Sequence, residues 1–158
     1  MRQNKIVFQF LSEPTDVNYG GKVHGGAVMK WIDQTGFSCA TMWSESYCVT
    51  VYVGGIRFYK PIHIGDLVRL EAQIIYTGRT SMHIAINVYS RKVSERDFEK
   101  KTHCIIVFAA VDEDGNTVEV PKFQPTTDTE IEMENYAIKL MNLRKNIEDE
   151  MSPFLISK

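Results

Sequence analysis

The segment AVMKWIDQTGFSCATMW, residues 27–43, decides the fold. It contains no proline and one glycine, and its only charged residues are Lys30 and Asp33. A helix that is apolar almost all the way round is typical of a protein interior rather than of a surface. We therefore expect one long buried helix around which the rest of the chain is arranged.

The segments on either side of this helix have the two-residue period of β-strands. A short strand is expected over Ile6–Leu11, and four longer strands over residues 49–58, 68–76, 82–88 and 104–111. After the pair Gly54–Gly55 the large apolar side chains change parity, which predicts a β-bulge there. The last of these strands is apolar on both parities, so we expect both of its faces to be buried, in the middle of the sheet or at a subunit contact.

A second helix is predicted near the end of the chain. Thr129 and Glu132 have the spacing of a capping box, and apolar side chains follow at helical spacing to Ile147. The order of elements predicts an α+β fold, an antiparallel sheet wrapped around one long central helix. We expect residues 1–125 to form a single domain, and residues 126–158 a helical extension packed on that domain or on an oligomer neighbour.

Composition excludes several classes of protein. A length of 158 residues corresponds to one domain, and a net charge of −2 offers no basic surface for nucleic acid. No stretch approaches 18 consecutive apolar residues, so no membrane span is expected. The three cysteines are scattered and odd in number, which indicates a reduced, cytoplasmic protein rather than a disulfide framework.

Asp33 is the strongest chemical signal, because a carboxylate in an apolar helix is costly to bury unless it is compensated. Such a residue is a candidate for function. The alternative is an exposed position, or an ordinary surface pair with Lys30 three residues earlier.

The glycine-rich run over residues 20–26 leads into the helix. It lacks the Lys and Ser/Thr of a phosphate-binding P-loop. Free N–H groups at a helix start can stabilise a developing oxyanion, but the run taken alone favours a glycine turn that permits close packing. The four histidines have no metal-ligand spacing, so we expect no metal site. No G-x-S-x-G motif is present, which excludes a serine nucleophile elbow.

Five motifs in order carry a resemblance to a known family. They are Asn18-x-x-Gly-x-x-His24-Gly25-Gly26 with Asp33, Phe58-x-Lys60-Pro61-Ile62 with Gly65-Asp66, Gly78-Arg79-Thr80-Ser81, Phe108-x-x-Val111-Asp112, and Pro121. Together they resemble the hotdog-fold acyl-CoA thioesterases, in the branch of cytosolic long-chain acyl-CoA hydrolases and their small, single-hotdog bacterial relatives. The resemblance runs from about Pro14 to Pro121.

The resemblance implies hydrolysis of a fatty acyl-CoA to a free fatty acid and coenzyme A, a step of fatty acid metabolism. It implies that Asp33 is the general base or nucleophile, and that Asn18 of a partner subunit holds the water or the thioester. Gly25 and Gly26, with His24, would bind the thioester carbonyl. The same helix N-terminus is expected to help keep Asp33 ionised.

For coenzyme A the resemblance implies a site at Gly78, Arg79, Thr80 and Ser81. Lys60 and Arg91 are candidates for its phosphates by charge. Coenzyme A enters as part of the substrate, and no cofactor is expected. The family's assembly is a homodimer, commonly a trimer of dimers (a homohexamer), with active sites at the dimer interface.

Two other functions are compatible with the same fold. One is a hydratase or dehydratase acting on acyl thioesters, which would use His24 with an acidic partner. The other is a non-catalytic acyl-CoA-binding sensor, which would bind coenzyme A esters without turnover. The context of Asn18 and the glycine pair favours the thioesterase over the first, and a retained Asp33 favours it over the second.

Overall fold

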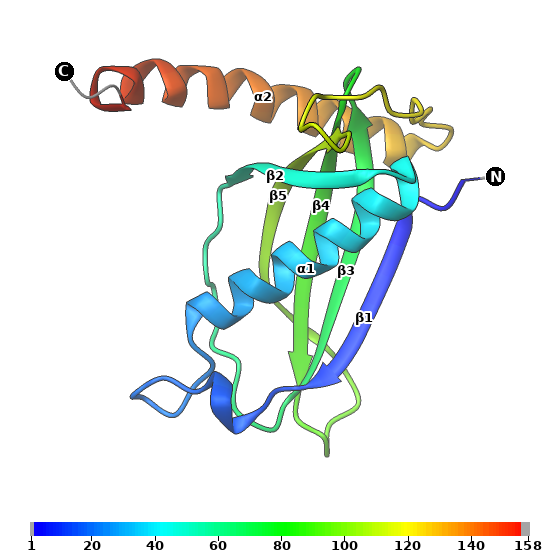
Figure 1. The fold of residues 1–158 in the computed structure, drawn as a ribbon. Helices are drawn as coiled ribbons and strands as arrows, with labels where there is room; N and C mark the ends of the chain where they lie inside the picture. The colour runs from blue at the N-terminus through cyan, green and yellow to red at the C-terminus, as the bar shows by residue number, and fades with distance from the viewer. Residues whose placement is uncertain (1, 156–158) are drawn as a thin grey trace.

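A computed structural model describes residues 2–155. It contains five strands, two long helices and one short 3-10 turn (Figure 1). In chain order these are β1 (Lys5–Leu11), η1 (Pro14–Asp16), α1 (Gly25–Ser44), β2 (Tyr47–Gly54), β3 (Leu67–Thr77), β4 (Ser81–Arg91), β5 (Glu99–Val111) and α2 (Asp128–Leu155). Among the described residues, no helix is both long enough and apolar enough to cross a bilayer.

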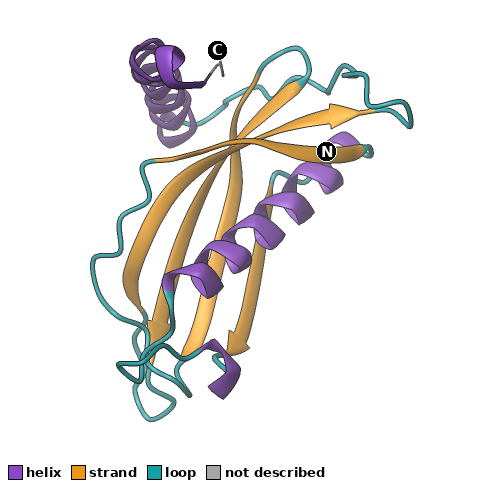
Figure 2. Ribbon diagram, turned by 60° about the vertical axis from the view of Figure 1, so that its left-hand side comes forward, coloured by secondary structure: helices purple, strands orange, loops and turns teal. Residues whose placement is uncertain are grey.

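The strands form one antiparallel sheet in the order β1-β3-β4-β5-β2. Figures 1 and 2 show α1 lying across one face of the curved sheet and α2 beyond the other. Two clusters of buried apolar side chains match these two layers, a large one under α1 and a small one under α2. The predicted α+β class, with a sheet wrapped around one helix, is confirmed.

Helix α1 buries one face only. Its closest approach to the sheet is at Gly36, where an added Cβ would lie 2.8 Å from the ring of Phe108. Elsewhere on the helix Met29 and Met42 are 47% and 41% exposed, and Lys30, Asp33 and Gln34 are exposed too. The prediction of a helix buried all the way round is therefore wrong for a single chain, because this sheet covers only one side of it.

Strand β5 has both faces covered, as predicted. Residues 104–111 are all buried. Ile106 and Phe108 point into the cluster under α1, whereas Ile105 belongs to the cluster under α2. The apolar side chains on both parities follow from this position between two helices.

The predicted β-bulge at Gly54–Gly55 is wrong. Strand β2 ends at Gly54, and Gly55 adopts a left-handed φ of 67° that turns the chain out of the sheet. The bulge lies earlier, at Val51, where the register with β5 shifts between Thr50 and Tyr52. The change of parity after the glycines therefore reflects the end of a strand.

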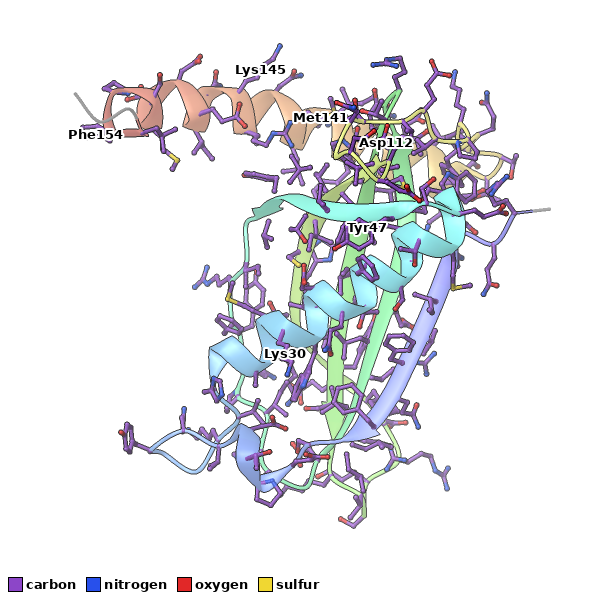
Figure 3. The ribbon with its side chains drawn as sticks, viewed as in Figure 1. Lys30, Tyr47, Asp112, Met141, Lys145 and Phe154 are labelled. Atoms are coloured by element: carbon purple, nitrogen blue, oxygen red, sulfur yellow. The ribbon has the colours of Figure 1, made fainter. Side chains whose placement is uncertain are left out.

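The capping box of α2 lies two residues before the predicted one. The Glu130 N–H donates to Thr127 Oγ1 (3.1 Å), and the Thr127 N–H donates to Glu130 Oε1 (3.2 Å). The sequence holds two overlapping Thr-x-x-Glu pairs, and the helix begins at the earlier one. The second half of α2 extends past the edge of the sheet where β2 lies, with Phe154 near its end (Figure 3).

Candidate active site

Asp33 lies on the open face of α1, where edge strand β2 runs alongside the helix. The Thr50 hydroxyl donates a hydrogen bond of 2.7 Å to Asp33 Oδ1. The other oxygen, Oδ2, accepts no hydrogen bond from residues 2–155. The side chain is thus held by one bond and presents a free carboxylate oxygen, which suits a group that takes a proton from water.

The surroundings of Asp33 differ from expectation in two ways. The residue is exposed in the single chain, so the predicted desolvation is absent there. The alternative pairing with Lys30 is also absent, since within residues 2–155 no ion pair joins the two side chains. Asp33 is held by a hydroxyl on β2, and its outer side is open in the single chain.

The N-terminus of α1 is built to leave two N–H groups free. His24 is the N-cap, and its Nδ1 accepts from the Ala27 N–H (3.1 Å). The N–H groups of Gly25 and Gly26 precede this bond and have no partner inside the helix. A Cβ added to Gly25 would lie 3.3 Å from the Phe58 ring, and one added to Gly26 would lie 3.1 Å from the His24 ring. Both contacts are tight, so glycine fits these positions.

This N-terminus lies far from Asp33 within one chain. Eight residues separate Gly25 from Asp33, which is about 12 Å along a helix. The field of a helix end falls off within the first turn, so the expected action of this N-terminus on Asp33 is absent within one chain. The same separation keeps the His24 ring, already engaged as the cap, away from Asp33 of its own chain.

Asn18 lies on an exposed loop before α1. Its Oδ1 accepts from the N–H groups of Gly20 (2.8 Å) and Lys22 (3.2 Å), which fixes the turn. Tyr19 next to it is fully exposed. In Figure 1 this loop projects from the body of the protein. The structure thus separates Asn18 from Asp33 within one chain and leaves the Asn18 amide NH₂ available to another.

The residues expected to contact coenzyme A fall into two groups at opposite ends of the sheet. Residues 78–81 form the turn between β3 and β4, near the C-terminal end of α1. There Arg79 and Lys122 line a hollow of about 520 Å³, and Arg79 forms an exposed ion pair of 3.6 Å with Glu119.

Lys60 and Arg91 lie at the other end, near the start of α1. Lys60 lines a hollow of about 290 Å³ together with Gly25 and Lys101, and it is paired with Glu99, whose pKa this pairing lowers. Arg91 donates from Nη1 to the carbonyl oxygens of Lys92 (3.2 Å) and Val93 (3.4 Å) in the loop that follows β4. Arg91 is therefore already committed to holding its own loop.

The cysteines are not reactive groups of this site. Burial raises the pKa of both Cys39 and Cys104 to about 12, so each is a neutral thiol. The three cysteines are unpaired and buried. Residues 2–155 contain no group of three His, Cys, Asp or Glu side chains placed to hold a metal ion.

Thr50 is the partner of Asp33 that sequence reasoning missed. It lies between Val49 and Val51 in a β-strand, where threonine is common for its shape alone. The only available signal was its position on the parity opposite the valines. At Cys48 and Thr50 that parity faces α1, and no residue type marks it.

Comparison with known proteins places the chain in a family. Residues 20–95 match the family described as Thioesterase superfamily. The chain is 33% identical over 122 residues to the acyl-CoA thioester hydrolase YciA of Salmonella typhimurium, an alignment that covers 75% of this chain and 92% of that protein. The chain belongs to the thioesterase superfamily.

Solved structures of other members of the superfamily share the fold. An acyl-CoA hydrolase from Bacillus cereus superposes with a TM-score of 0.87 at 26% identity, over 97% of this chain and 95% of that one. A hexameric thioesterase from Yersinia pestis superposes with a TM-score of 0.69 at 34% identity, over 73% of this chain and 94% of that one. The resemblance to hotdog-fold acyl-CoA thioesterases and their small bacterial relatives is confirmed.

Proposed function

We propose that this superfamily member hydrolyses the thioester of a fatty acyl-CoA, giving a free fatty acid and coenzyme A. The observation that carries the proposal is the Asp33 carboxylate, held by Thr50 on the open face of α1 with one oxygen free. The relative from Salmonella typhimurium is named for the same reaction. The proposed reaction uses no cofactor, because coenzyme A is part of the substrate.

In the proposed mechanism Asp33 is the general base. Its free oxygen takes a proton from a water molecule while the water oxygen attacks the thioester carbon. The carbonyl oxygen becomes an oxyanion, which accepts hydrogen bonds from the N–H groups of Gly25 and Gly26. When the intermediate collapses, the carbon–sulfur bond breaks, and the coenzyme A thiolate leaves and is protonated. His24 contributes by capping the helix and aiming these N–H groups.

The site is proposed to form between two chains. Gly25 lies about 12 Å from Asp33 along α1, so one thioester is not expected to reach both groups within one chain. A partner subunit would supply its own helix N-terminus, and the NH₂ of its Asn18 would orient the water or the thioester. The projecting loop around Asn18 supports this arrangement because it extends away from its own chain.

Edge strand β2 is proposed to form the dimer interface. Its backbone is unpaired on one side, and the exposed side chains along it include Val49, Val51 and Val53. An exposed edge strand with apolar side chains tends to pair with another strand. Pairing of β2 with β2 of a second copy would also enclose Asp33, since Thr50 ties that residue to the same strand. A trimer of such dimers would give a hexamer, the state named for the Yersinia pestis relative.

The coenzyme A moiety is proposed to bind at the turn from Gly78 to Ser81. Thr80 would lie beside its pantetheine part, and Arg79 would face its phosphates. The exposed ion pair of Arg79 with Glu119 is weak and can be exchanged for a phosphate contact. Lys60 is the second candidate, from a different subunit of the assembly. Three unpaired, buried thiols suit a reducing compartment, so we place the reaction in the cytoplasm.

The test is release of free thiol from a panel of acyl-CoAs, acetyl to palmitoyl, by the wild type, Asp33→Asn and Asp114→Asn. Asp114 lies in an exposed turn, so its variant controls for the same chemical change. We expect turnover to fall at least about 100-fold in Asp33→Asn and to persist in Asp114→Asn. Binding of coenzyme A esters without turnover by the wild type would favour the sensor instead.

A further inference from the structure

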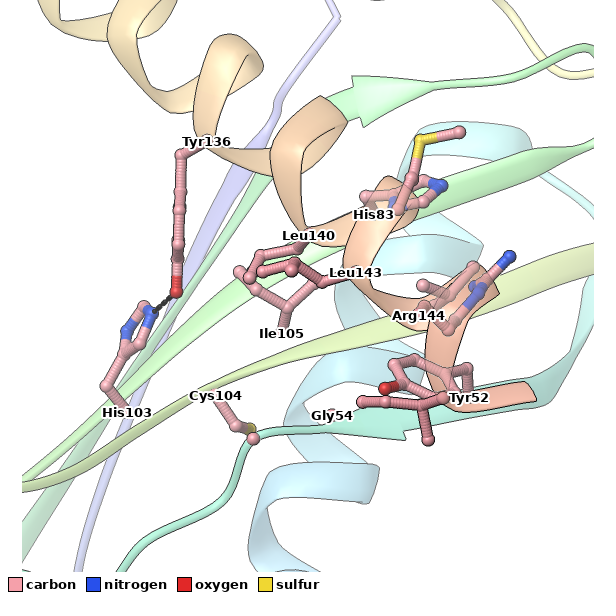
Figure 4. Close-up of a pocket in the computed structure, with 14 residues that line it drawn as sticks. Tyr52, Gly54, His83, His103, Cys104, Ile105, Tyr136, Leu140, Leu143 and Arg144 are labelled. Carbon is pink, nitrogen blue, oxygen red and sulfur yellow. Dashed lines mark hydrogen bonds between the residues drawn. The ribbon is translucent and has the colours of Figure 1, made fainter. Parts of the chain in front are cut away.

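Helix α2 and the outer face of the sheet enclose a cavity of about 270 Å³ (Figure 4). It lies on the side of the sheet away from α1 and from Asp33. Its walls are mostly apolar, with Ile105 and Val107 from β5 and Leu140 and Leu143 from α2. The volume is close to the lower end of the range for small-molecule sites, about 300–1,000 Å³, which favours a slender ligand.

One cationic group in this cavity lacks hydrogen-bond partners. Nε and Nη1 of Arg144 are buried, and neither has a hydrogen-bond partner among residues 2–155. The guanidinium lies 4.9 Å from the centre of the Tyr52 ring, and Glu148 approaches Nε to 3.4 Å as an ion pair. Buried donors without acceptors are rare in native proteins and call for a missing partner. A guanidinium stays charged and presents paired donors that match a carboxylate.

The other polar groups of the cavity are neutral. Burial, and then the charge of Arg144, lower the pKa of His83 to about 4. His103 is bonded on both ring nitrogens, to Asn87 Oδ1 (2.8 Å) and to the Tyr136 hydroxyl (2.9 Å), and burial lowers its pKa as well. Figure 4 shows the His103–Tyr136 bond at one end of the cavity and Arg144 with Tyr52 at the other. Arg144 is therefore the charged residue among those that line the cavity, and its unpartnered Nη1 sets the preference for an anion.

We propose that this cavity binds a carboxylate with an unbranched apolar chain of medium length. The carboxylate lies on Nη1 of Arg144, which has no partner among residues 2–155, and the alkyl chain of the ligand lies among Leu140, Leu143 and Ile105. The free fatty acid of the proposed reaction belongs to this chemical class, and only that link rests on the proposed function. The site itself is separate from the catalytic face of α1.

The experiment measures binding of sodium octanoate by titration calorimetry to the full chain. Octan-1-ol has the same chain without the charge, and octyl phosphate carries a different anion. We expect octanoate to bind more tightly than either. We expect Arg144→Met, which keeps bulk and removes the charge, to weaken octanoate binding at least about 10-fold. Lys145→Gln, the neighbouring exposed cation, should bind as the wild type does.

Two further measurements locate the ligand. Octanoate should shift the ring resonances of His83 and leave those of the exposed His63 unchanged. Leu143→Trp adds bulk from a position that is 56% exposed, so it should fold and block the cavity. The proposal is wrong if Arg144→Met and wild type bind octanoate equally, if octan-1-ol binds as well as octanoate, or if octanoate does not bind because a second copy fills the cavity. Because the assay needs no turnover, its outcome is independent of the test of hydrolysis.

Discussion

The hydroxyl of Thr50 and the carboxylate of Asp33 are joined by a hydrogen bond of 2.7 Å that links edge strand β2 to helix α1. The strand that would meet a second chain therefore also orients the proposed base. In the proposed dimer this contact would couple assembly to catalysis, because a displacement of β2 would release Asp33.

This contact predicts the behaviour of two variants of Thr50. Thr50→Val keeps the shape of the side chain and removes the donor, so kcat should fall about 10- to 100-fold, the cost of a hydrogen bond to a charged group. Thr50→Ser keeps the donor and should retain most of the activity. Thiol release over a range of acyl-CoA concentrations separates kcat from KM. Equal activity of the valine and serine variants would remove Thr50 from the mechanism.

The two edge strands give a matched test of the proposed dimer. Val51 on β2 and Val7 on β1 are 56% and 49% exposed. A lysine on an edge strand opposes strand pairing. Val51→Lys should therefore give a smaller species by light scattering and lose thiol release, whereas Val7→Lys should leave both unchanged. If Val51→Lys keeps the wild-type assembly mass and Val7→Lys gives a smaller species, the dimer interface lies on β1 instead.

The fold was largely predictable because its strongest signals are periodic. Residues 27–43 and the alternating segments up to Val111 place a helix and a sheet without reference to any tertiary contact. The errors arose where one pattern has two physical causes. A glycine pair in a strand can be a bulge or a strand end, and here Gly55 turns the chain away. Overlapping Thr-x-x-Glu pairs left the start of α2 uncertain by two residues.

The candidate site was predictable only in part, because it depends on tertiary and quaternary geometry. Asp33 was identified because burying a carboxylate in an apolar helix costs free energy, although the residue is exposed in a single chain. Thr50 carried no signal of its own. The separation of Gly25 from Asp33 follows from helix length, yet the need for a second chain becomes clear only when the sheet is seen to cover one side of α1.

Gly36 sets the distance between α1 and the sheet. An added Cβ would lie 2.8 Å from the Phe108 ring and 3.0 Å from Ile106 Cγ2, both of which are fully buried. Gly36→Ala should therefore destabilise the protein by about 1–3 kcal/mol, although alanine favours helices in isolation. Chemical denaturation measures the loss. Gln34→Ala, at an exposed position of the same helix, should show no such loss.

His83 predicts how stability depends on pH. Burial, then the charge of Arg144, lower its pKa in the folded state to about 4, against an ordinary value of 6.5. The unfolded chain therefore binds the proton more readily, and stability that is present above pH 6.5 is lost as the pH falls toward 4. Linkage gives a loss of about 2 kcal/mol between pH 7.5 and pH 5 from this residue.

The measurement for His83 is the free energy of unfolding at several pH values in the wild type, His83→Gln and His63→Gln. Whatever the stability of His83→Gln at pH 7.5, its slope between pH 7.5 and pH 5 should be shallower, since one buried proton acceptor is gone. His103, whose pKa burial also lowers, will still contribute to the slope that remains. His63 is exposed, so its variant should keep the wild-type slope. Identical slopes in the wild type and His83→Gln would show that His83 is solvated in solution, and the cavity beside Arg144 would then be open to water.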